Sequence, residues 1–93
     1  MDDYAQIAQK IIEQQENVIG PVAIEQAQMV SGLKLDWGKQ HSVTVTGNEP
    51  AVIDKLVEKY KDLFGKISVE VCKEAAAKIT SKMEPSELPQ SLK

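Results

Sequence analysis

Few side chains in this chain have the type and spacing that catalysis or metal binding requires. Cys72 is the single cysteine and His41 the single histidine among 93 residues. A catalytic cysteine needs a nearby base, and a zinc site needs several cysteine or histidine ligands. The sequence around these two residues offers neither. We therefore predict that Cys72 is a buried apolar residue and that His41 is a loop residue packing on Trp37, and we expect no catalytic residue, metal site or cofactor.

Trp37 is the side chain with the greatest potential for binding. Its default role is to anchor the buried face of a β-hairpin, while the alternative is an exposed aromatic at a protein interface. If Trp37 is exposed at an interface, the residues around it form a candidate interaction surface. This surface consists of Trp37, Lys39, His41 and Lys34.

The charge of the chain limits the partners it can bind. All eleven cationic side chains are lysines, and the formal net charge is −3. Arginine is the residue that best binds phosphates and guanine edges, so its absence argues against tight nucleic-acid binding. No apolar run approaches the roughly 18–20 residues that span a bilayer, and no export signal is visible at the acidic start. With a single cysteine, these features favour a cytoplasmic protein.

Residues 32–47 have a two-residue period that predicts a β-hairpin. Leu33 and Leu35 alternate with polar residues before a glycine-bearing break, and Val43 and Val45 alternate with polar residues after it. Residues opposite each other on antiparallel strands point to the same face. Only an odd loop, of three residues (38–40) or of five, or a bulge keeps the apolar residues opposite one another.

The rest of the chain repeats every three to four residues, as helices do. Gly20-Pro21 predicts a break or kink after the first helix, and the glutamines of the first helices suggest solvated or interfacial faces. Residues 67–72 fit either a strand or a helix, and we favour a helix over 68–82. The strongest apolar stripe comprises Val52, Ile53, Leu56, Val57, Tyr60, Leu63 and Phe64.

These elements predict one small α+β domain over residues 1–82. It has two N-terminal helices, or one kinked helix, then a β-hairpin, then one or two C-terminal helices packed on one face of the sheet. Residues 83–93 contain two prolines and few apolar anchors, so we expect a mobile tail.

From Val18 to Tyr60 the sequence resembles a KH domain. An Ile19-Gly20 step precedes a helix, a glycine-led strand follows, and the run from Val43 to Gly47 leads into a helix opening near a proline. KH domains hold nucleic acids with a GxxG loop. The matching place here, residues 19–23, lacks the second glycine and a lysine, and the family's first strand has no counterpart. The resemblance therefore implies a fold whose grip on nucleic acid has been lost.

The sequence contains clear patterns for helices and strands but few candidate catalytic or ligand-binding residues. This favours a non-enzymatic protein-interaction or assembly module. The hairpin leaves two strand edges, which would form a four-stranded sheet if two copies paired, so we expect a homodimer. The alternative is a degenerate KH-like nucleic-acid-binding domain that uses Lys34 and Lys39. A small enzyme, which would depend on Cys72 and His41, ranks third.

Overall fold

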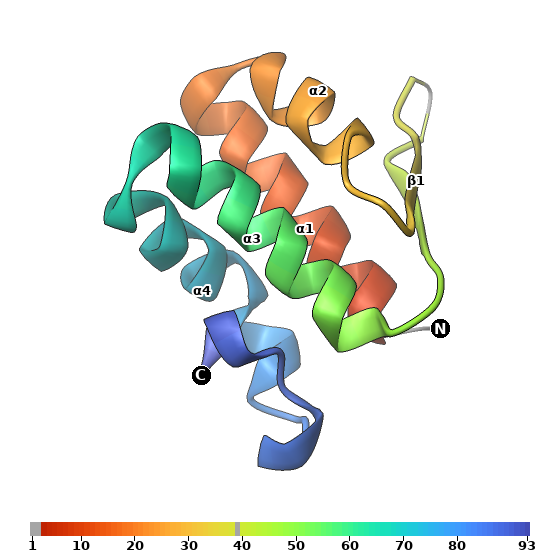
Figure 1. Ribbon diagram of the computed structural model, residues 1–93, viewed down its shortest axis with the longest axis vertical. Helices are drawn as coiled ribbons and strands as arrows, with labels where there is room; N and C mark the ends of the chain where they lie inside the picture. Colours follow the sequence, from red (N-terminus) through yellow and green to blue (C-terminus); the bar gives the residue numbers. More distant parts are fainter. Residues whose placement is uncertain (1–2, 39) are drawn as a thin grey trace.

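The computed structural model describes residues 3–38 and 40–93, and its elements follow the predicted order of two helices, a hairpin and two helices (Figure 1). The helices are α1 (Asp3–Ile19), α2 (Val22–Gln28), α3 (Glu49–Phe64) and α4 (Lys66–Thr80), and the strands are β1 (Leu33–Asp36) and β2 (Ser42–Val45). Two short 3-10 turns follow, η1 (Pro85–Glu87) and η2 (Gln90–Leu92). The predicted α+β fold class is confirmed. None of the helices within these residues has the length and apolar character of a membrane span.

Glycine and proline set the ends of the helices as the sequence indicates. Gly20 has a φ of 77° and separates α1 from α2, which confirms the predicted break at Gly20-Pro21. Gly65, with a φ of 80°, separates α3 from α4 in the same way. The Asn48 side chain caps α3 by accepting a hydrogen bond from the Ala51 N–H at 3.3 Å. Such caps satisfy amides that the first helical turn leaves free.

The ambiguous residues 67–72 are helical and belong to α4, so the favoured interpretation is confirmed. This helix buries the small side chains Ser68, Cys72 and Ala76, which are four residues apart. Small residues on a shared face allow two helix backbones to approach closely, and α4 makes its most extensive contacts with α1.

The hairpin has the register that the alternation predicts. Leu33 pairs with Val45 and Leu35 with Val43, and the two strands are antiparallel. The strands end at Asp36 and Ser42, so the loop has five residues, an odd number. The predicted parity is thus confirmed. The hairpin contacts α1 through β2 and α2 through β1 (Figure 1).

The hydrophobic core lies between the four helices and the inner face of the hairpin. Its fully buried large side chains include Ile7, Ile11 and Ile12 of α1 and Ile53 and Leu56 of α3. The predicted stripe of α3 is buried only as far as Tyr60. Leu63 is 50% exposed and Phe64 is 39% exposed, so the apolar stripe of the sequence continues beyond the part of α3 that the core covers. They lie in the last turn of α3, just before Gly65.

One glutamine of α1 departs from the expected solvated face. Gln15 is fully buried, and its Nε2 donates to the Ser68 carbonyl oxygen at 3.2 Å and to the Cys72 sulfur at 3.4 Å. Two acceptors on α4 therefore replace the water that an exposed amide would bind.

The C-terminal residues pack on the helices. Leu92 is 8% exposed and belongs to the core cluster, and Pro89 is fully buried. The carboxylate of Asp54 accepts hydrogen bonds from residues 90 and 91. These contacts favour a docked segment, while the predicted mobility of residues 83–93 and the domain boundary at residue 82 stay predictions.

Candidate functional site

The tip of the hairpin is held against α1 by side-chain contacts. The rings of Trp37 and His41 stack with centroids 4.2 Å apart and planes 3° from parallel. Trp37 Nε1 donates to Glu16 Oε1 at 3.2 Å, and His41 Nδ1 lies 2.8 Å from Glu13 Oε2. Both carboxylates come from α1. The predicted packing of His41 on Trp37 is confirmed, and these four residues brace the hairpin on the helix.

The four residues of the candidate interaction surface have different places in the structure. Trp37 is half-buried against the core and His41 is exposed beside it. Lys34 is exposed on the outer face of β1, opposite Thr44. Lys39 lies outside the described residues. The structure thus brings Trp37 and His41 together, and their polar groups are already paired with α1, which leaves the binding role of this surface a prediction.

Cys72 lies among buried polar groups that connect the helices. It is fully buried, and burial raises the pKa of its thiol to about 11, while the hydrogen bond from Gln15 opposes part of that rise. Burial also raises the pKa of Tyr60, whose hydroxyl donates to the Ala23 carbonyl oxygen at 2.7 Å. A protonated, inaccessible thiol is a poor nucleophile. The hydrogen bonds of Gln15 connect α1 to α4, and that of Tyr60 connects α3 to α2. The burial of Cys72 agrees with its prediction as a buried residue.

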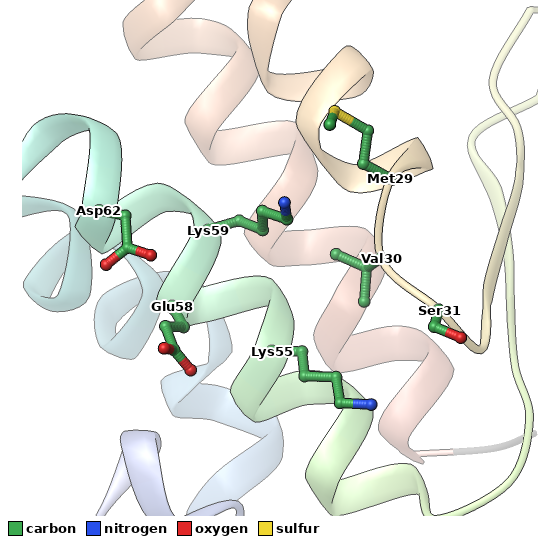
Figure 2. A pocket seen from close by; sticks show the side chains of 7 residues that line it. All are labelled: Met29, Val30, Ser31, Lys55, Glu58, Lys59 and Asp62. Atoms are coloured by element: carbon green, nitrogen blue, oxygen red, sulfur yellow. The ribbon is translucent and has the colours of Figure 1, made fainter.

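A shallow hollow of about 280 Å³ lies between the end of α2 and the outer face of α3. Figure 2 shows Lys55 and Lys59 extending toward the residues that follow α2, while Glu58 and Asp62 point the other way. The last carbonyl groups of a helix favour nearby positive charge. The positions of the two lysines near the end of α2 agree with this preference. The remaining lining residues are Met29, Val30 and Ser31.

Five large apolar side chains are exposed around the two turns that connect the helices. We call this surface the apolar end, and it consists of Val18, Val22, Leu63, Phe64 and Ile67. The α1–α2 turn and the α3–α4 turn lie at the same end of the molecule (Figure 1, upper left). The hydrogen bonds Gln15–Ser68 and Tyr60–Ala23 join the elements on either side of both turns.

The apolar end was not among the predicted surfaces, although the sequence contains a signal for it. Val18 and Val22 flank Gly20-Pro21, and Phe64 and Ile67 flank Gly65. These four residues lie next to the turns that connect the helices. Exposure at such positions ranges here from 38% for Val22 to 73% for Ile67.

The described residues 3–38 and 40–93 hold no group of three histidine, cysteine, aspartate or glutamate side chains that could bind a metal ion. No family model, no curated protein and no solved structure matches the chain.

Proposed function

We propose that this protein is a non-enzymatic interaction module that assembles with a second copy of itself through the apolar end. The observation that carries this proposal is the exposure of five large apolar side chains in one region of a small domain. Single exposed apolar residues are common on protein surfaces, whereas a contiguous apolar patch marks a site of interaction.

A second copy is a suitable partner because an apolar end is self-complementary. A two-fold axis brings the same surface of both copies together, so Phe64 and Ile67 of each copy become covered at once. Lys61 and Lys66, which neighbour patch residues in the sequence, and Glu25 of α2 are all exposed and provide charges of both signs for a polar rim. Interfaces commonly combine such an apolar centre with a polar rim.

The oligomeric state in solution tests this proposal. Sedimentation velocity of the wild type, at protein concentrations up to the order of 1 mM, should show a dimer. The double substitution Phe64→Ser and Ile67→Ser should shift the population to monomer, because it removes the two side chains at the centre. Met29→Ser is the matched control, since Met29 is 63% exposed but lies outside the apolar end.

Two results would contradict the proposal in different ways. A wild type that stays monomeric at all concentrations excludes self-association. A dimer that persists in the double variant places the interface elsewhere, and the unpaired edges of β1 and β2 are then the next surface to test.

We also propose a cytoplasmic setting. The free, buried thiol of Cys72 supports this, because unpaired cysteines are usual in reducing compartments.

The second candidate function is a degenerate KH-like nucleic-acid-binding domain. It is supported by the helix–helix–strand–strand–helix order of residues 3–64 and by the lysines Lys55 and Lys59 in the hollow beside α2. The turn at Gly20-Pro21 is flanked by Val18 and Val22 and carries no lysine. A gel shift of labelled RNA or DNA at low salt that disappears at high salt would favour this candidate.

A further inference from the structure

We propose that the C-terminal segment, residues 84–93, is an exchangeable ligand, and that the groove it occupies on α3 and α4 also binds the same segment of a second copy. This contact is separate from the apolar end, which lies at the far end of α3. The proposal goes beyond self-association through that surface, because it assigns a peptide-binding site.

Asp54 of α3 recognises the backbone and side chain of the segment. Its carboxylate oxygens accept hydrogen bonds from the Ser91 hydroxyl at 2.6 Å, the Ser91 N–H at 2.9 Å and the Gln90 N–H at 3.3 Å. Hydrogen bonds to an ionised carboxylate are stronger than neutral ones. A single side chain of the folded core thus satisfies three donors of the segment.

Apolar and backbone contacts extend the recognition along the segment. Leu92 is 8% exposed within the core cluster, and Pro89 is fully buried. Near the start of the segment, the Tyr4 hydroxyl of α1 donates to the Glu87 carbonyl oxygen at 2.7 Å. The segment therefore binds as a short peptide does, with buried apolar anchors and hydrogen bonds to backbone groups.

Prolines and internal hydrogen bonds pre-organise the segment in its bound conformation. Pro85 begins η1 and Pro89 precedes η2. The Glu84 N–H also donates to Glu87 Oε1 at 3.1 Å, which closes a capping box within the segment. Prolines and local hydrogen bonds reduce the conformational entropy lost on binding. A segment of this kind can bind from another molecule at a lower entropic cost than an unrestricted peptide.

The groove has further open space next to the segment. A hollow of about 430 Å³ continues from Asp54 and Ser91 along the two helices, where Val57 and Val69 form part of its lining. Residues 81–83 link α4 to the segment and form a turn. Exchange between two copies re-forms every contact of the segment and changes this connection, including the packing of Met83 on the core, which is the usual basis of domain swapping.

A labelled peptide tests the groove in the intact chain. The probe is a fluorescent peptide of residues 84–93, and the protein is the full-length Leu92→Ala variant, whose own segment competes less well. Fluorescence anisotropy should show that the variant binds the peptide at least about tenfold more tightly than the wild type. Adding Asp54→Ala to the variant should abolish binding, because the three donors lose their acceptor.

Controls separate recognition from nonspecific association. A peptide in which Ser91 and Leu92 are both alanine should bind at least about tenfold more weakly than the native peptide. Equal binding of the two peptides, or no binding to a Leu92→Ala chain that circular dichroism shows to be folded, overturns the proposal. If Leu92→Ala does not fold, full-length Ser91→Ala serves instead, because it removes only the hydroxyl contact.

Exchange between copies is tested with the Phe64→Ser and Ile67→Ser variant, which lacks the apolar end. Concentrated and then diluted, it should retain a slowly dissociating dimer that excess unlabelled peptide suppresses. If this variant is strictly monomeric, exchange between copies is overturned even when the peptide binds. A dimer of the wild type that is insensitive to peptide but lost in this variant overturns exchange and leaves the apolar end as the interface.

Discussion

Polar side chains inside the core determine how the helices are aligned. Gln15 reaches two acceptors on α4, and Tyr60 donates to a carbonyl oxygen of α2. A buried donor without its acceptor costs about 1–3 kcal/mol. A shift of α1 along α4 by one residue would break both contacts of Gln15. These residues therefore specify one alignment among several that would bury similar apolar area.

The buried thiol makes stability depend on alkaline pH. The pKa of Cys72 rises from 9.0 to about 11 in the folded state, with burial as the main cause. A pKa that is higher in the folded than in the unfolded state adds stability that is complete below about pH 9 and is lost as the pH rises through 11. This contribution is on the order of 2–3 kcal/mol. Urea denaturation at about pH 8 and about pH 11 should show the decrease.

The Cys72→Ala variant isolates the thiol in this experiment. At neutral pH it should be less stable than the wild type by about 1 kcal/mol, because it leaves a small cavity and removes one of the two acceptors of the Gln15 amide. Between the two pH values it should lose about 2 kcal/mol less than the wild type. Tyr60, whose pKa is also raised by burial, keeps some pH dependence in both proteins. Parallel losses in the two proteins would contradict the assignment to Cys72.

At the scale of elements, Gly32 determines how β1 leaves α2. It has a φ of 90°, and a Cβ at this position would lie 2.9 Å from Val52 Cγ2 and 3.0 Å from the Thr46 carbonyl oxygen. Gly32→Ala therefore combines backbone strain with a clash against Val52 of α3 and against the backbone of Thr46, which follows β2. We expect a loss of about 2–4 kcal/mol in the free energy of unfolding, measured by chemical denaturation.

Two other glycines separate these causes. Gly47 has a φ of 81° but open space around its Cα, so Gly47→Ala measures backbone strain alone and should cost about 1–2 kcal/mol. Gly38 has neither a positive φ nor a close neighbour, and Gly38→Ala should change stability by less than about 0.5 kcal/mol. Equal losses for Gly32→Ala and Gly47→Ala would show that the contact with Val52 is unimportant.

Strand pairing and helix ends depend on residues close in the sequence, and both were predictable. The exposure of a side chain depends on residues far away in the sequence, and it was not predictable. The pairing of Leu35 with Val43 follows from the two-residue period. The separation of α1 from α2 follows from Gly20-Pro21, which restricts the backbone directly. Leu63 continues the apolar stripe of α3, yet it is half exposed, because the stripe alone does not show how far along the helix the core extends.

The candidate sites show the same limit. Leu92 stands in a polar, proline-containing sequence, and only its neighbours in three dimensions show that it packs on the helices. Glutamine is a residue type usually found at the surface, and the burial of Gln15 depends on hydrogen-bond acceptors 53 and 57 residues away in the sequence. The contact of Trp37 with His41 was predictable because both belong to one short loop, while their carboxylate partners on α1 were not.

At the scale of the whole molecule, the two proposed contacts use different forces. The apolar end consists of exposed apolar side chains, while the groove of the C-terminal segment depends on the carboxylate of Asp54. Each copy also carries a net charge of −3, so two copies repel one another weakly at any interface. Salt screens this repulsion and leaves apolar burial intact.

The net charge therefore predicts how salt changes self-association. Raising the salt concentration from about 0.05 M to about 0.5 M should leave the dissociation constant of the dimer unchanged or lower it. Binding to nucleic acid would weaken strongly over the same range, because it releases condensed counterions. Sedimentation equilibrium of the wild type in this salt series provides the measurement, with the Phe64→Ser and Ile67→Ser variant as the control that lacks the apolar end. A dimer that dissociates as salt increases would show that pairs of lysines and carboxylates, rather than apolar burial, hold the copies together.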